Sequence, residues 1–299
     1  MYKRQPKTLP GDSINWFDDK DDDSNWSRYL DLLERKGWQD KTKKNIEIST
    51  RKIMNFLFNP KETVVDKKYG LVVGHVQSGK TANYTGLMAR AADSGYNLII
   101  VLAGLHNNLR KQTQVRLERE LMGKDTHPDG FHVNPPESFD WIKITTQEDD
   151  FQKLPDIAMI SGNNPVIAVV KKNVSPLTKL YEMLYDFSEE KRIKINLLMV
   201  DDESDHASIN TMKRDENVIN DLIHLPYEDE EDEEDEEDEE INSTKINTRV
   251  RQILGLFPRS AYVGYTATPF ANVLIPSDDQ HNQLGQTLYP RDFIMALTK

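Results

Sequence analysis

The sequence predicts an α/β fold: a doubly wound, mostly parallel sheet with a helical extension at its N-terminus. Two observations support this prediction. Short apolar runs recur along the chain, and segments whose apolar residues follow helical spacing separate them. The runs at 97–103 and 195–200 are almost wholly apolar, as expected for strands covered by helices on both faces. Strands that alternate with helices in this way favour a parallel sheet.

The predicted elements begin at residue 26. Two helices occupy 26–58, where Asn59 and Pro60 end the second. We therefore expect a flexible acidic arm (1–25), a helical region (26–66) and an α/β lobe (67–299). Within the lobe the apolar runs and helical spacings predict strands at 71–73, 97–103, 141–144, 165–170, 195–200 and, last, 260–264, and helices at 81–92, 105–121, 177–184 and 247–257.

Composition limits the class of protein. The 299 residues include no Cys, which excludes disulfides and thiolate metal sites, and no apolar stretch is long enough to span a membrane. We expect a cytoplasmic protein. Thirteen of the 50 acidic residues form an unbroken run at 228–240, and the other 37 nearly match the 38 Lys and Arg. The net charge of −12 therefore does not exclude nucleic-acid binding. We expect the run to be a disordered insertion; a tether that mimics DNA is the alternative.

The most specific motif follows the first predicted strand. Residues 74–81, GHVQSGKT, fit the phosphate-loop pattern G-x-x-x-x-G-K-[ST] without a mismatch. Gly74 and Gly79 let backbone N–H groups turn toward phosphate oxygens, and the following helix N-terminus favours negative charge. Lys80 is expected to reach the β- and γ-phosphates of ATP, and Thr81 to bind Mg²⁺. A chance glycine-rich turn is the alternative. The predicted cofactor-binding residues are Gly74, Gln77, Ser78, Gly79, Lys80, Thr81 and Ala82.

The second motif is the acidic sequence DDESD at 201–205, directly after a predicted strand. A carboxylate at the carboxyl end of a parallel strand can face a phosphate loop on a neighbouring strand. We expect Asp202 to hold Mg²⁺, directly or through water, and Glu203 to be the general base toward the attacking water. Asp201 remains open as the metal ligand, and an ordinary acidic loop is the alternative. The predicted catalytic residues are Lys80, Asp202 and Glu203.

The third motif, GYTATP at 264–269, follows the last predicted strand. We expect the hydroxyls of Thr266 and Thr268 to hydrogen bond to carboxylates of the second motif, where Asp205 completes a D-E-x-D pattern. Such bonds would link the nucleotide state to the rim of the sheet. A strand end followed by a turn at Pro269 is the alternative.

In this order, the three motifs resemble the first RecA-like lobe of a superfamily 2 helicase or translocase. The longer strings at 74–84, 101–114 and 261–272 resemble the Z1-domain family, and the resemblance extends over residues 26–299 with the acidic run as an insertion. Z1 proteins are described as endonucleases and resemble ATP-dependent motors of restriction-like and antiviral defence systems, sometimes beside MutL- or MORC-like ATPases. The resemblance implies a P-loop ATPase with ATP and Mg²⁺ as cofactors and DNA as partner.

The resemblance also implies a second lobe beyond residue 299 that closes over ATP and supplies arginine fingers. Stabilisation of the transition state by such an arginine is worth about 10³–10⁵ in rate. We therefore expect this chain alone to bind nucleotide but to hydrolyse it poorly.

In the motors that this chain resembles, strand-to-helix loops opposite the ATP site contact a nucleic-acid backbone. Two clusters of cations and amides near helix starts could bind phosphates in this way, although solvated loop charge is an equal alternative. Neither cluster interleaves aromatic residues, so we expect salt-sensitive contacts to the backbone of double-stranded DNA. The predicted contacts are Asn107, Asn108, Arg110 and Lys111 after one strand, and Lys171 and Lys172 after another.

Two other functions remain open. The chain could be a nucleotide-gated interaction module in which ATP controls assembly with partner proteins and DNA is incidental. It could also be an endonuclease proper, although we find no nuclease signature in the sequence.

Overall fold

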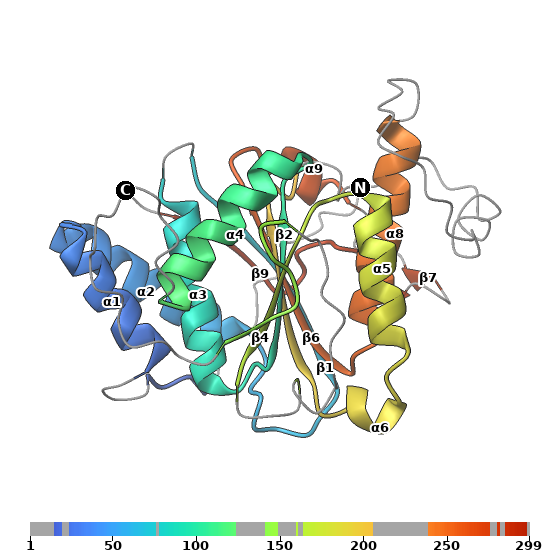
Figure 1. Ribbon diagram of the computed structural model, residues 1–299, viewed down its shortest axis with the longest axis horizontal. Helices are drawn as coiled ribbons and strands as arrows, with labels where there is room; N and C mark the ends of the chain where they lie inside the picture. Colours follow the sequence, from blue (N-terminus) through green and yellow to red (C-terminus); the bar gives the residue numbers. More distant parts are fainter. Residues whose placement is uncertain are drawn as a thin grey trace, which may run out of the picture.

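A seven-stranded, all-parallel sheet forms the centre of the protein (Figure 1). The computed structural model describes residues 15–19, 24–75, 78–123, 141–148, 160, 164–205, 239–275, 280–281 and 285–297. The strand order is β3-β4-β2-β5-β6-β1-β9. The bounds are β1 (Asp66–Val73), β2 (Leu98–Ala103), β3 (Ile142–Lys143), β4 (Val166–Val170), β5 (Asn196–Asp202), β6 (Arg259–Thr266) and β9 (Phe293–Ala296). The predicted α/β class with a parallel sheet is thus confirmed.

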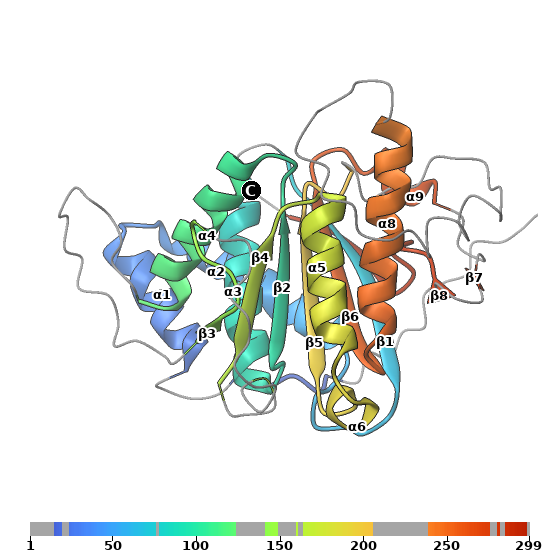
Figure 2. The ribbon, with the colours of Figure 1, turned by 45° about the vertical axis from the view of Figure 1, so that its right-hand side comes forward.

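Helices cover both faces of this sheet (Figures 1 and 2). One face carries α1 (Asn25–Arg35), α2 (Asp40–Phe56), α3 (Lys80–Ser94) and α4 (Asn107–Leu121). The opposite face carries α5 (Val174–Tyr185) and α8 (Glu239–Gly255). Two short helices, α6 (Glu189–Arg192) and α9 (Phe270–Val273), and the antiparallel pair β7 (Gln280–His281) and β8 (Gly285–Gln286) complete the described elements.

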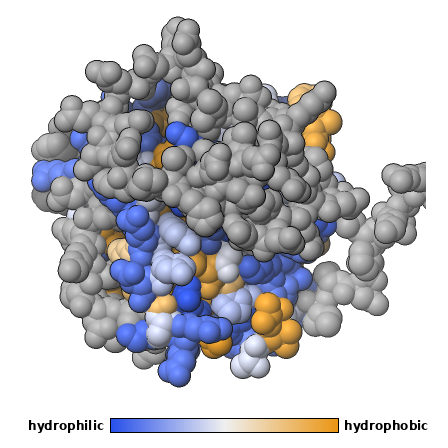
Figure 3. Space-filling model, turned by 90° about the vertical axis from the view of Figure 1, so that its right-hand side faces the viewer, coloured by the Kyte–Doolittle hydropathy of each residue, from blue (hydrophilic) through white to orange (hydrophobic). Residues whose placement is uncertain are grey.

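Alternate residues of the central strands enter two separate hydrophobic cores. Leu198 and Val200 of β5 face the core beneath α1–α4, whereas Leu197 and Met199 face the core beneath α5 and α8. The period of two along a strand produces this division. The described residues that Figure 3 leaves visible on the α5 and α8 side are mainly hydrophilic, with small separate hydrophobic patches among them. Both faces are therefore covered, which explains the nearly continuous apolar strands.

The helical region before the sheet packs as part of this same core. Tyr29 of α1 is buried and donates a hydrogen bond from its hydroxyl to the carbonyl of Ala82 in α3, at 2.9 Å. Trp26 and Ile46 belong to the core cluster that contains the buried residues of α3. The predicted boundary at residue 66 therefore marks the start of β1 but does not separate two packing units.

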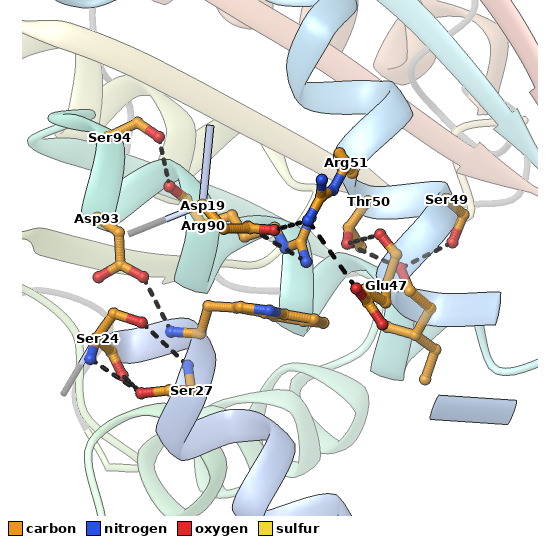
Figure 4. A network of polar contacts seen from close by, with 12 residues as sticks. Asp19, Ser24, Ser27, Glu47, Ser49, Thr50, Arg51, Arg90, Asp93 and Ser94 are labelled. Atoms are coloured by element: carbon orange, nitrogen blue, oxygen red, sulfur yellow. Dashed lines mark hydrogen bonds and ion pairs between the residues drawn. The ribbon is translucent and has the colours of Figure 1, made fainter. Parts of the chain in front are cut away.

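The prediction that residues 1–25 form a flexible arm is wrong for 15–19. Phe17 is buried, and the indole N–H of Trp16 donates to the carbonyl of Leu57 at 2.8 Å. Asp19 forms ion pairs with Arg51 and with the buried Arg90 (Figure 4). Apolar packing and the ion pair with a buried cation hold this short segment in place. Its acidic composition does not indicate these contacts. Residues 1–14 and 20–23 lie outside the described part of the chain.

The guanidinium of Arg90 is held between rings and carboxylates. Its central carbon lies 3.8 Å from the centroid of the Trp26 ring, and Asp19 Oδ1 is 3.3 Å from one of its terminal nitrogens. Burial lowers the pKa of Arg90 to about 10, so the group remains charged at neutral pH. Among the described residues no acceptor makes a well-aligned hydrogen bond with its nitrogens, so Asp19 and the cation–π contact are its main described stabilising partners.

The prediction that 260–264 is the last strand of the sheet is wrong. β9 follows it and pairs in parallel with β1 at the edge of the sheet, with Phe293 opposite Gly70. Its four residues are too few to show a period of two against background. Of the acidic run, 228–238 lies outside the described residues, while Glu239 and Glu240 are assigned to α8. Among the described helices, none is both long and apolar enough to cross a membrane.

We expect Asp19→Ala to destabilise the protein by about 2 kcal/mol, because it leaves the buried Arg90 cation without its nearest counter-charge. Urea unfolding followed by circular dichroism measures this change. The neighbouring exposed residue gives a matched control, Asp18→Ala, which should change stability by less than about 0.5 kcal/mol. Equal effects of the two substitutions would show that Arg90 does not depend on Asp19.

Candidate functional site

The three sequence motifs follow three adjacent strands. β6 lies between β5 and β1 and pairs in parallel with both, so that Tyr265 is opposite Val72 on one side and Asp202 on the other. The carboxyl ends of parallel strands meet at one edge of the sheet. The phosphate-loop pattern, the acidic motif and the threonine motif therefore begin side by side at this edge.

The loop after β1 closes tightly and then starts α3. The Gly74 N–H donates to the carbonyl of Thr266 at 2.9 Å, which extends the β1–β6 pairing by one residue. Gly79 adopts a left-handed conformation, with φ at +80°, directly before the first residue of α3. The Lys80 ammonium donates to the carbonyl of Gly74 at 3.2 Å, so it lies across the loop. Val76 and the predicted contact Gln77 lie outside the described residues.

The described part of this loop fits a phosphate group. The side-chain hydroxyl of Ser78 is buried, and within the described structure it has no hydrogen-bond partner. A Cβ at Gly74 would overlap this hydroxyl, so glycine is needed to let the two segments approach. A buried hydroxyl without a partner is costly unless a ligand supplies one. The loop, Lys80 and the start of α3 together form an arrangement that suits an anion.

The structure separates the two adjacent aspartates of the second motif. Asp202 lies on the same face of β5 as Leu198 and Val200, the face that α3 covers. Tyr84 of α3 donates a hydrogen bond from its hydroxyl to Asp202 Oδ2 at 3.2 Å. Burial raises the pKa of Asp202, while the Tyr84 hydrogen bond and the positive charges of Lys172 and Lys80 act in the opposite direction. Asp202 therefore lies on the α3 side of the sheet, where the charge of Lys80 acts on it.

Asp201 points into the opposite core and is fully buried. Its Oδ1 forms an ion pair with the Lys172 ammonium at 2.8 Å, and its Oδ2 accepts a hydrogen bond from Tyr262 at 2.6 Å. The possibility that Asp201 is the metal ligand is therefore wrong, since the sheet lies between its carboxylate and α3.

Glu203 has an unusual backbone conformation. In the described chain it is the only residue other than glycine with a positive φ, at +55°. Its side chain is exposed and its carbonyl accepts a hydrogen bond from the Lys172 ammonium at 2.6 Å. Residues in this region carry backbone strain and tend to occur at functional sites.

The predicted link between the second and third motifs is present. Thr266 Oγ1 donates to Asp205 Oδ1 at 2.7 Å, and the Thr268 hydroxyl donates to the other oxygen of the same carboxylate. The Thr268 N–H in turn donates to Thr266 Oγ1 at 2.9 Å. The carboxylate of Asp205 thus holds both hydroxyls of the TAT sequence, as the motif order predicted.

Magnesium would have few protein ligands here. No group of three or more His, Asp or Glu side chains that could hold a metal ion occurs among the residues that the structure describes. Mg²⁺ generally keeps several waters and binds through one or two protein oxygens plus substrate phosphates, and Thr81 and Asp202 carry oxygen donors of this kind. Thr81 and Asp202 are the predicted ligands, and Tyr84 interacts with both of them.

The predicted nucleic-acid contacts divide into two groups. The loops after β2 and β4 lie at the same edge as the phosphate loop, rather than opposite it, because the whole sheet is parallel. Arg110 is buried and donates to the carbonyls of Thr146 and Gln147, while Lys171 and Lys172 are also buried. The prediction that these three cations face a nucleic acid is wrong for the conformation described. Those that remain exposed are Asn107, Asn108 and Lys111.

Sequence reasoning missed Tyr84 and assigned Lys172 to nucleic-acid binding instead of to the acidic motif. Tyr84 lies three residues after Thr81 on the same helix face, a spacing that could have indicated it. Lys172 comes from the end of β4, two strands from β5, so only the fold brings it to the acidic motif.

No family model matches this sequence, and no curated protein sequence matches it.

We expect Asp202→Asn to raise the melting temperature at pH 7 without added metal. Burial raises the pKa of this carboxyl, so the folded state favours the protonated form, and its charge destabilises the fold above the raised pKa. A gain of about 1 kcal/mol corresponds to a shift of roughly 1–2 °C in a chain of this length. Thermal unfolding in EDTA from pH 3 to pH 7 measures the difference, which should shrink as pH falls toward the ordinary aspartate value.

A difference that grew toward low pH would contradict this explanation. Glu203→Gln, which neutralises an exposed carboxylate beside Asp202, is the matched control and should have a smaller effect.

Proposed function

We propose that this chain is the ATP-binding motor lobe of a superfamily 2 helicase- or translocase-like protein that acts on DNA. The adjacency of β5, β6 and β1 is the observation that carries the proposal. It brings a phosphate-loop sequence, a D-E-x-D sequence and a TAT sequence to one edge, with Asp205 bonded to Thr266 and Thr268. A chance phosphate-loop match would not be expected to have both other motifs beside it.

In this proposal each side chain has a distinct role. Backbone N–H groups of 74–79, the Ser78 hydroxyl and Lys80 bind the phosphates, while Thr81 and Asp202 hold Mg²⁺. The ion neutralises phosphate charge when it is bound. Glu203, whose side chain is exposed beside Asp202, orients the attacking water and accepts its proton. Asp205 links the nucleotide state to the rim of the sheet through its hydrogen bonds with Thr266 and Thr268.

Two points support DNA as the partner. The Z1 resemblance supports it, as does the position of Asn107, Asn108 and Lys111, which are exposed at the start of α4 on the same edge as the ATP motifs. Backbone N–H groups at a helix start and a nearby lysine can bind phosphates. A role in restriction-like or antiviral defence, with MutL- or MORC-like proteins, comes from the resemblance alone.

A second function, a nucleotide-gated interaction module, is favoured by a different observation. Arg110, Lys171 and Lys172 are buried, which reduces the predicted basic surface. Beside Thr268, the side chains of Phe270 and Leu274 are 77% and 79% exposed. An ATP-responsive carboxylate next to exposed apolar side chains suits contact with a protein. Partner capture that requires ATP and survives nuclease treatment would favour this alternative.

ATP with Mg²⁺ should raise the melting temperature of the wild type and not that of Lys80→Ala. The substitution removes the ammonium that lies across the loop, and ligand at a hundred times its Kd stabilises by about 2.7 kcal/mol. A thermal-shift titration measures this effect. Lys52→Ala, an exposed lysine of α2, is the control and should retain the full shift. The ATP proposal fails if the wild type shows no shift, or if Lys80→Ala shifts as much as the wild type.

DNA affinity should fall with salt, and Lys111→Ala should weaken it at low salt. Removing one phosphate contact should reduce the slope of log K against log salt concentration by about 1. Fluorescence anisotropy with a labelled duplex, between 50 and 200 mM salt, measures both quantities. Lys41→Ala, an exposed lysine at the start of α2, should leave affinity and slope unchanged. Identical slopes for the wild type and Lys111→Ala would exclude this lysine as a contact.

A further inference from the structure

Lys172 reaches the acidic motif from a distant strand. It follows β4, and β2 separates β4 from β5 in the sheet. The Lys172 N–H donates to the carbonyl of Gly104, just after β2, at 2.9 Å. This hydrogen bond anchors the start of the lysine beside β2. From there its side chain, which is fully buried, extends to the end of β5.

The Lys172 ammonium contacts the residue before Asp202 and the residue after it. It forms an ion pair with Asp201 Oδ1 at 2.8 Å and donates a hydrogen bond to the carbonyl of Glu203 at 2.6 Å. The contact with Asp201 is electrostatic rather than a well-aligned hydrogen bond, so the Glu203 carbonyl is the better-directed partner. One cation therefore fixes the residues before and after the predicted metal ligand.

This contact explains how Glu203 is kept in a strained conformation. A positive φ is unfavourable for a residue with a side chain and persists only where surrounding contacts enforce it. The Ser204 N–H donates to the carbonyl of Tyr265, and Asn272 donates to the Ser204 carbonyl, so the following residue is also fixed. Lys172 holds the Glu203 carbonyl itself and lies on the side of the turn away from α3.

We propose that Lys172 is a positioning residue for ATP hydrolysis: its ammonium holds the turn at 201–203 so that Asp202 and Glu203 face the phosphate loop. This inference rests on the proposed function for its catalytic consequence. The restraint on the turn is independent of any nucleotide. The hydrogen bond to the Glu203 carbonyl and the ion pair with Asp201 are the contacts through which Lys172 restrains the turn.

The test removes the ion pair as a unit. Lys172→Met alone would leave Asp201 as a lone buried charge, which can unfold a protein. The double variant Lys172→Met/Asp201→Asn leaves no unpaired charge, and Met has a stem of similar length. Tyr262→Phe is the matched control, because it removes the other partner of Asp201 and keeps both contacts of Lys172. Thermal unfolding without ligand identifies the variants that fold.

Two further measurements use the chain as it stands. Hydrogen exchange of the amides at 203–205 reports on the turn without nucleotide. Single-turnover hydrolysis, with protein in excess over labelled ATP, reports on chemistry even where turnover is slow. For the double variant we expect exchange at least about tenfold faster and hydrolysis about 10–100-fold slower, the usual effect of losing an outer partner of a metal site. ATP affinity should stay within about threefold, and Tyr262→Phe should match the wild type.

The possible outcomes distinguish failure of this inference from failure of the proposed function. Unchanged exchange in a folded double variant overturns the positioning role, and so does faster exchange with unchanged hydrolysis. Loss of ATP binding together with hydrolysis would show a general disruption and would also overturn it. If the wild type neither binds nor hydrolyses ATP, the proposed function and the catalytic role of Lys172 both fail, while faster exchange would still establish the restraint on the turn.

Discussion

The position of β6 between β5 and β1 is the constraint on which the candidate site depends. Parallel pairing on both sides places Val72, Tyr265 and Asp202 in one row across the sheet. The three motifs therefore start at the same level, and short side chains such as Thr266 and Asp205 can meet at hydrogen-bonding distance. A shift of one residue in the β5–β6 pairing would turn Asp202 to the other face and break this arrangement.

The alternation of side chains along β5 places the two neighbouring aspartates on opposite faces of the sheet. Asp202 faces α3, where Tyr84 and Lys80 influence it, and Asp201 faces a core from which water is excluded. A buried carboxylate needs a partner, so the fold uses Lys172 and Tyr262 for this purpose. A lysine that is buried in such an ion pair is not available to bind a ligand at the surface. The burial of Lys172 against Asp201 thus explains both why this lysine is not an exposed basic contact and how the turn at 201–203 is restrained.

The sequence could predict the fold class and the contact between the second and third motifs because both depend on local patterns. Apolar runs of five to seven residues indicate covered strands, and the motif order indicated the bonds from Thr266 and Thr268 to Asp205. It could not show which charged side chains are buried. Arg110 lies in the polar first turn of α4 and Lys172 in the loop after β4, but their partners lie 36 and 31 residues away and only tertiary packing brings them together. The segment at 15–19 was missed for the same reason, whereas β9 was missed because its four residues are too few to show a period of two.

Features that oppose folding concentrate at the end of β5. Glu203 has a strained backbone, Asp202 is a desolvated carboxylate whose pKa is raised, and Ser78 nearby has a buried hydroxyl without a partner among the described residues. Each of these is expected to lower stability, and packing alone gives no reason to keep them together. Strain and unsatisfied polar groups that share one edge of a well-packed sheet are typical of sites that act on a ligand. The physical properties of these residues therefore indicate a functional site at this edge, apart from any resemblance of their sequence.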